Sequence, residues 1–183
     1  MKDLHLFITN ECHLDCPLCC NKQYDVEKIP LVTKEDIKNT RMVLLTGGEP
    51  LLEQNLVTST VQRIRQIWRE SLFEFGFEVF MRKIIVYTTG RFLNEKFLTN
   101  RENVIDGFSI SPKGIEDWKN IMDAKIATNL NRYQSNRLYV FDKTAYKYYK
   151  PFLNFKYTLV EREWQKEFVP APNSEFKRLY NLC

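Results

Sequence analysis

Six runs of apolar residues, each ending in glycine, proline or polar residues, divide this chain of 183 residues. Short apolar runs bounded by turn-forming residues are typical of strands buried in a sheet. The predicted strands are 4–9, 42–46, 83–90, 104–111, 137–141 and 155–160.

The segments between these runs carry apolar residues at helical spacing. From position 53 to about 71 the pattern predicts an amphipathic helix, with apolar positions at Leu56, Val57, Val61, Ile64, Ile67 and Trp68. Thr33, with Asp36 three residues later, predicts a capped helix over 33–40. Shorter helices are expected near 92–99, over 114–126 and over 143–150. The segment 72–81 fits either a strand or extended arm, or a helix interrupted at Gly76.

The alternation of strands and helices predicts the fold class. Apolar strands separated by helices favour an α/β fold with a mostly parallel, curved sheet covered by helices. Because six strands are fewer than the eight of a closed barrel, we expect a partial (β/α)6 barrel. Residues 1–160 form this core, and residues 161–183, which include Pro170 and Pro172, are expected to form a C-terminal tail packed on it.

Composition narrows the setting of the chain. The sequence has no signal peptide at its start and no apolar run of the roughly 18 residues that a membrane span needs. We therefore expect a cytoplasmic protein, in which clustered cysteines indicate metal or redox chemistry and not disulfides. The net charge of +4 is mild, but the segment from Lys113 to Lys156 contains nine Lys and Arg residues and only four Asp and Glu residues. That excess suits an anionic substrate or an acidic partner, although a solvated surface explains it as well.

Four of the five cysteines follow the first strand. Cys12, Cys16 and Cys19 form a C-x3-C-x2-C pattern, and Cys20 is adjacent. Zinc prefers four ligands, commonly in two pairs, and the chain offers no second pair. Three thiolates on one loop are instead what an iron–sulfur cluster needs if one iron is to accept another ligand. We expect Cys20 to face the protein and Cys183 to be an incidental thiol.

The cysteine pattern after the first strand, followed by Gly47-Gly48-Glu49-Pro50 after the second, resembles the radical S-adenosylmethionine (SAM) superfamily. The resemblance implies that Cys12, Cys16 and Cys19 hold a [4Fe-4S] cluster. It also implies that this cluster cleaves SAM to a 5′-deoxyadenosyl radical, which abstracts hydrogen from a substrate. A reducing partner such as a flavodoxin or ferredoxin would supply the electron.

The carboxyl ends of the other strands would complete the cofactor site. The two glycines let the backbone approach a ligand, and Glu49 can accept hydrogen bonds from an ammonium group; in the family this segment binds the amino group of SAM. Thr89 stands where the family often has asparagine. The hydroxyls of Ser109 and Ser111 and the ammonium of Lys113 could hold the SAM carboxylate or the substrate. An ordinary turn explains Ser111-Pro112 equally well.

The sequence leaves the reaction subclass and the substrate open. The substrate could be a small molecule, a nucleobase or a protein. The segment 109–114 is similar to part of the 7-carboxy-7-deazaguanine synthases, and small activases of glycyl-radical enzymes are another alternative. A non-enzymatic module that binds a cluster or zinc on the same fold is the third.

The stretch 142–157 interleaves basic and aromatic residues, as nucleic-acid-binding surfaces do. A helix with Tyr146, Tyr149 and Phe152 packed inward and its lysines outward explains the same pattern, and we favour that interpretation.

Overall fold

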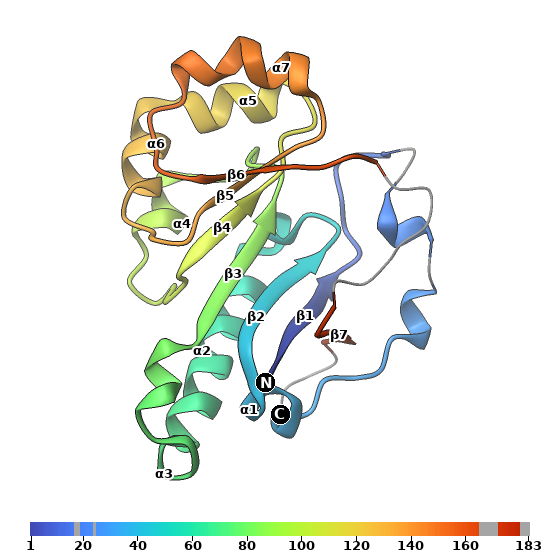
Figure 1. The fold of residues 1–183 in the computed structure, drawn as a ribbon, viewed down its shortest axis with the longest axis vertical. Coiled ribbons are helices and arrows are strands. Elements are labelled where there is room, and N and C mark those ends of the chain that lie inside the picture. Colours follow the sequence, from blue (N-terminus) through green and yellow to red (C-terminus); the bar gives the residue numbers. More distant parts are fainter. Residues whose placement is uncertain (17–18, 24, 165–171, 180–183) are drawn as a thin grey trace.

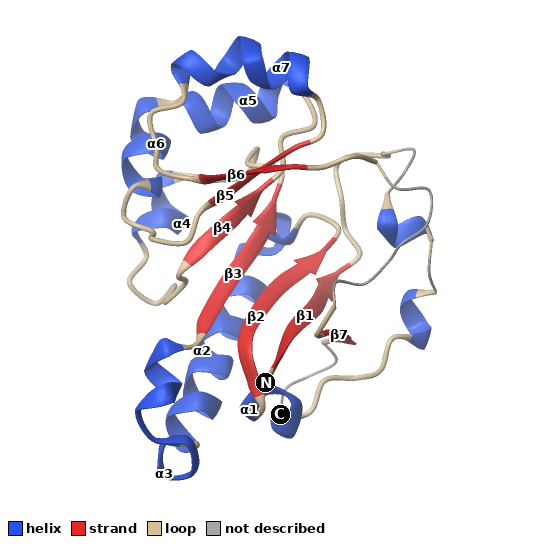
Figure 2. Cartoon of the chain, in the orientation of Figure 1, coloured by secondary structure: helices blue, strands red, loops and turns tan. Residues whose placement is uncertain are grey.

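The computed structural model describes residues 1–16, 19–23, 25–164 and 172–179 (Figure 1). Its centre is a sheet of seven parallel strands in the order β6-β5-β4-β3-β2-β1-β7. The strands are β1 (Lys2–Thr9), β2 (Thr40–Gly47), β3 (Lys83–Thr88), β4 (Gly107–Ile110), β5 (Arg137–Val140), β6 (Thr158–Glu161) and β7 (Ser174–Arg178). The sheet is not closed, so the predicted α/β fold with a partial barrel is confirmed (Figure 2).

The seventh strand was not predicted. Ser174–Arg178, in the segment expected to be a tail, pairs in parallel with β1 from Asp3↔Ser174 to Phe7↔Arg178. The backbone N–H of Asp3 also donates to the carbonyl of Asn173 at 3.0 Å. β1 is therefore an interior strand of the sheet, with β2 on one side and β7 on the other.

The helices lie at the predicted positions, except that the one expected over 114–126 is divided into two. They are α1 (Lys34–Lys38), α2 (Gln54–Glu70), α3 (Leu72–Phe75), α4 (Glu95–Thr99), α5 (Ile115–Met122), α6 (Ala124–Leu130) and α7 (Lys143–Tyr149), with short 3-10 turns η1 (Cys20–Lys22), η2 (Val26–Lys28), η3 (Pro50–Glu53), η4 (Gly76–Met81) and η5 (Lys150–Phe152). The predicted capping box of α1 is present, with Thr33 and Asp36 each accepting from the other's backbone N–H.

The helix expected over 114–126 is interrupted at Asp123. The side chain of Asp123 accepts hydrogen bonds from the backbone N–H groups of Lys125 and Ile126, so it caps the start of α6 and ends α5. Ile115, the first residue of α5, is 61% exposed.

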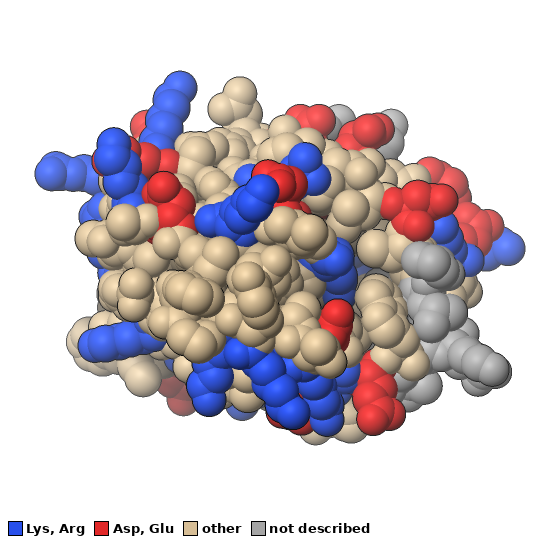
Figure 3. All heavy atoms as spheres, turned by 90° about the horizontal axis from the view of Figure 1, so that it is seen from above, with Lys and Arg blue, Asp and Glu red and all other residues tan. Residues whose placement is uncertain are grey.

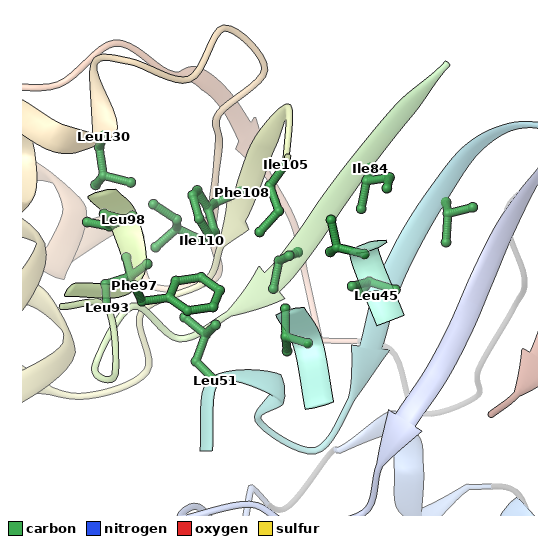
Figure 4. Close-up of a cluster of buried hydrophobic side chains, with 14 of the residues drawn as sticks. Leu45, Leu51, Ile84, Leu93, Phe97, Leu98, Ile105, Phe108, Ile110 and Leu130 are labelled. Atoms are coloured by element: carbon green, nitrogen blue, oxygen red, sulfur yellow. The ribbon is translucent and has the colours of Figure 1, made fainter. Parts of the chain in front are cut away.

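One hydrophobic core lies between the sheet and its helices. Alternate residues of the strands, such as Leu45, Ile84 and Phe108, pack against buried helical side chains (Figure 4). The opposite face of the sheet is mixed: Phe7, Leu44 and Ile85 are buried there, and the other intervening positions carry His5, Tyr87, Ser109, Arg137 and Tyr139.

The segment 72–81 turns out to be helical and interrupted at Gly76, one of the two predicted forms. Gly76 has φ +57° and ψ −147°, a conformation that favours glycine, and it separates α3 from η4. The sharp reversal leaves four large side chains on the outside, Phe73, Phe77, Phe80 and Met81.

The basic and aromatic stretch 142–157 forms α7 and η5. Tyr146 is buried and Tyr149 packs against the core, as predicted. The prediction that Phe152 packs inward is wrong, because Phe152 is exposed. The 3-10 turn η5, which contains Pro151, places Leu153 and Phe155 against the core instead. Charged side chains lie unevenly over the surface, and Figure 3 shows Lys and Arg gathered along the lower margin of that view.

Candidate functional site at the carboxyl edge of the sheet

The predicted site residues follow four neighbouring strands, β1 to β4, at one edge of the sheet. Because all strands are parallel, their carboxyl ends meet there. Cys12 is exposed, while Cys16 and Cys19 are half-buried, and the Cys19 N–H donates to the Cys16 carbonyl at 3.2 Å. The side chain of Cys20 and the whole of Cys183 lie outside the described residues.

The cysteines lie near each other and near the loop after β4. Burial raises the pKa of the Cys16 thiol, and the neighbouring ammonium of Lys113 acts in the opposite direction. The nearby thiols of Cys12 and Cys19 also raise the pKa of Cys16. Even so, within the described ranges no group of three His, Cys, Asp or Glu side chains is close enough together to hold a metal ion. The three thiols are the donors that an iron–sulfur cluster needs, and because each would bind a different iron they need not converge on a single ion.

The Gly47-Gly48 pair packs directly against the beginning of the cysteine loop. A Cβ on Gly48 would lie 2.0 Å from the carbonyl oxygen of Glu11, and one on Gly47 would lie 2.2 Å from that of Thr9. The Gly48 N–H donates to the Thr9 carbonyl at 2.8 Å. Glycine is therefore required at both positions by the close contact between the two loops, independently of any ligand that the backbone approaches.

Two further hydrogen bonds join the same loops. The Glu49 N–H donates to the Glu11 carbonyl at 2.7 Å, and the Asn21 amide donates to the Gly47 carbonyl at 2.8 Å. One bond precedes Cys12 and the other follows Cys20. The cysteine loop is therefore held against the loop after β2 at both of its ends.

The Glu49 side chain ties in a third loop. It is 1% exposed, and one of its oxygens accepts from the Thr89 N–H at 2.7 Å while the other accepts from the Leu51 N–H at 3.3 Å. Pro50 starts η3 directly after it. The Glu49 carboxylate thus connects the loops after β2 and β3 by accepting from backbone N–H groups, a role that the sequence did not indicate.

The remaining predicted residues lie on β4 and its loop. Ser109 is buried in the strand, and the Ser111 N–H donates to the Thr88 carbonyl at 2.8 Å. The Ser111 hydroxyl, like that of Ser109, is buried and has no hydrogen-bond partner among the described residues, which leaves both predicted serines to bind a ligand there. The Lys113 ammonium lies over the rings of Phe141 and Trp164, 3.5 Å and 4.4 Å from their centroids.

Sequence reasoning missed His13 and Asp117. The His13 ring lies edge-on to Phe92 with the centroids 4.8 Å apart, and its Nε2 is 3.9 Å from an Asp117 carboxylate oxygen. The other Asp117 oxygen accepts from the N–H groups of Lys113 and Gly114 at 2.8 Å and 3.0 Å. Asp117 three residues after Gly114 is a capping pattern that could have indicated this carboxylate.

The sequence of this chain was compared with those of known proteins, and one similarity bears on the parallel α/β sheet and its three-cysteine loop. No family model matches the chain. The chain is 29% identical to GTP 3′,8-cyclase of Aquifex aeolicus (strain VF5) over 132 residues, which cover 66% of this chain and 38% of that protein. The chain thus spans less than two fifths of the length of that relative.

This similarity supports the resemblance to the radical SAM superfamily in general and leaves the subgroup open. A separate observation bears on the membrane: no helix in the described part of the chain is both long and apolar enough to cross one.

Proposed function

We propose that this protein is a radical SAM enzyme. The observation that carries the proposal is the attachment of the three-cysteine loop to the Gly47–Pro50 segment by hydrogen bonds at both ends. The similarity to GTP 3′,8-cyclase, a radical SAM enzyme, supports the same class.

In this proposal Cys12, Cys16 and Cys19 hold the [4Fe-4S] cluster, and residues Gly47–Pro50 line the SAM site. When bound, these groups supply one-electron cleavage of SAM and hydrogen abstraction from a substrate. The chain itself positions them: Asn21 and the backbone of Glu49 fix the ends of the cysteine loop, while Thr89 is held in place by the Glu49 carboxylate. Ser111 and Lys113 offer a hydroxyl and an ammonium to a carboxylate. Ser109 lies deeper, within β4.

The name of the relative favours a purine nucleotide or nucleobase substrate over a protein substrate. A 7-carboxy-7-deazaguanine synthase-like reaction falls within that class. An activase of a glycyl-radical enzyme would instead act on a protein. We place the protein in the cytoplasm with a flavodoxin or ferredoxin as electron donor.

Anaerobic reconstitution with iron and sulfide tests the proposal. We expect about four irons per chain, in line with the [4Fe-4S] type, and release of 5′-deoxyadenosine from SAM in the presence of dithionite. Cys16→Ala should abolish both, whereas the matched variant Cys183→Ala should retain both. Tight binding of zinc in place of iron, or a loaded cluster that never cleaves SAM, would refute the enzyme and favour the non-catalytic module.

A further inference from the structure

The hairpin formed by α3 and η4 presents an apolar surface to solvent. We name this surface the hairpin patch and define it by Phe73, Phe77, Phe80 and Met81. Phe73 is fully exposed, and the other three are 86%, 67% and 78% exposed in that order. The Phe77 and Phe80 rings lie side by side, with their centres 6.2 Å apart. Exposed apolar side chains scattered singly are normal on a protein surface, whereas a contiguous group of this kind marks an interaction site.

The hairpin is anchored to the core by the buried side chain of Arg82. The Arg82 guanidinium lies 4.6 Å from the centre of the Phe75 ring and 5.9 Å from that of Trp68. It also donates to the Lys38 carbonyl at 2.7 Å. Gly76 fixes the reversal between α3 and η4, with a φ that favours glycine. The patch therefore has a fixed shape, and its side chains are held outward by the contacts beneath them.

The area of the patch is close to what one partner contributes to a stable dimer. A free side chain of this size exposes about 200 Å². The exposed fractions of the four residues therefore correspond to about 670 Å² of surface. The largest apolar patch of a typical monomer covers about 300 to 600 Å². Each partner in an interface of standard size contributes about 800 Å², so these four residues supply most of that area.

The charges around the patch suit a second copy of this chain. Arg69 and Glu78 are exposed, and within the described ranges neither forms an ion pair. Because a two-fold contact places the same surface on both sides, each copy can offer its arginine to the other copy's glutamate. An anionic membrane is a poorer match, since the segment 69–81 carries three glutamates and one arginine.

The patch lies at the edge of the sheet opposite the candidate functional site. η4 ends at Met81, and β3 begins two residues later at Lys83, so the patch is at the amino ends of the strands. Figure 1 shows α3 beyond those ends, whereas the cysteine loop follows the carboxyl end of β1. A second copy seated on the patch would therefore leave the candidate site open.

We propose that two copies of this chain form a closed two-fold dimer through their hairpin patches. The phenylalanine side chains of one copy pack on those of the other, and Arg69 of each copy faces the partner's Glu78. A two-fold contact buries the patch completely in a dimer, whereas a head-to-tail contact would extend into larger assemblies. The inference goes beyond the proposed function and does not depend on it.

Sedimentation equilibrium of the purified full chain tests the dimer. We expect the 21.9 kDa monomer and a species of twice that mass to interconvert over about 1 to 100 µM. The double variant Phe73→Ala/Phe77→Ala should weaken the association at least about a hundredfold, because it removes four aromatic rings from each dimer. Phe152→Ala is the matched control, since it removes a phenylalanine that is 56% exposed on η5, and should leave the association unchanged. Far-UV circular dichroism verifies that the variants retain the fold.

Charge exchange tests the two-fold arrangement. Arg69→Glu leaves only carboxylates facing one another and should weaken the association about tenfold or more. Arg69→Glu/Glu78→Arg restores the pair with its signs exchanged and should recover most of the lost affinity. No recovery in this variant would overturn the assigned contact.

The remaining outcomes decide what the patch binds. A chain that stays monomeric up to about 100 µM, or that forms a series of ever larger species, would overturn the dimer. So would equal association of Phe73→Ala/Phe77→Ala and Phe152→Ala. A monomeric chain that sediments with vesicles of phosphatidylcholine and phosphatidylglycerol, and loses this binding in Phe73→Ala/Phe77→Ala, would assign the patch to a membrane instead.

Discussion

Replacing Gly48 by alanine probes the contact between the cysteine loop and the loop after β2. The added Cβ would lie 2.0 Å from the Glu11 carbonyl oxygen, although real Cβ contacts essentially never fall below 3.0 Å. The two loops must therefore separate by about 1 Å, which strains the hydrogen bonds of 2.8 Å and 2.7 Å between them.

The expected cost follows from these two effects. Overpacking costs about 1 to 3 kcal/mol and each of the two strained hydrogen bonds about 0.5 kcal/mol, so Gly48→Ala should lower the free energy of unfolding by about 2 to 4 kcal/mol. At a urea dependence of about 2 kcal/mol per molar, the unfolding midpoint should fall by about 1 to 2 M.

Urea unfolding followed by circular dichroism measures this shift, and iron content after reconstitution reports on the cysteine loop. Gly114→Ala is the matched control, because a Cβ there meets nothing within 4 Å. We expect its midpoint to shift by less than about 0.5 M. If the two variants unfold at the same urea concentration and take up the same iron, the two loops do not depend on their close contact.

Three further predictions concern buried polar groups. Glu49→Gln turns an NH2 group towards a backbone N–H and should lower the free energy of unfolding by about 1 to 3 kcal/mol, measured by urea unfolding. Asp117→Ala removes the acceptor for the first N–H groups at α5 and should cost about 1 to 2 kcal/mol by the same assay, with the exposed Glu116→Ala as control. Burial lowers the pKa of His5 from 6.5 to about 4, so the unfolded chain takes up the proton first as the pH falls. Stability should therefore decrease from about pH 6.5 towards pH 4, by about 2 kcal/mol at pH 5, and His5→Phe should remove this part of the pH dependence.

The sequence predicted the strands that position the site because their cores are continuous apolar runs. The parallel arrangement alone predicted that the cysteines, Gly47–Pro50 and Thr89 lie at the same edge of the sheet. β7 escaped prediction because Ser174–Arg178 has a single aromatic residue, Phe176, among polar ones. Such a segment becomes a strand only through its partner, here β1, and no local pattern carries that information.

The details of the site were less predictable for a similar reason. Gly47 and Gly48 were interpreted as room for a ligand, yet their close neighbours are backbone atoms of Thr9 and Glu11, 38 and 37 positions earlier along the chain. The break at Asp123 and the outward turn of Phe152 depend on single caps and one proline, which shift a helical period by a residue or two. The location of His13 beside Asp117 is a tertiary contact between different loops.

The pairing of β7 with β1 has a consequence for the synthesis of the protein. β1 is made well before β7, so one of its two edges is covered only by residues that are made some 170 positions later. Until then its backbone donors and acceptors on that side are open to other nascent or misfolded chains. Conditions that slow translation before β7 is made should therefore increase the fraction of the product found in inclusion bodies. This increase should be larger than the stability of the folded protein alone would suggest.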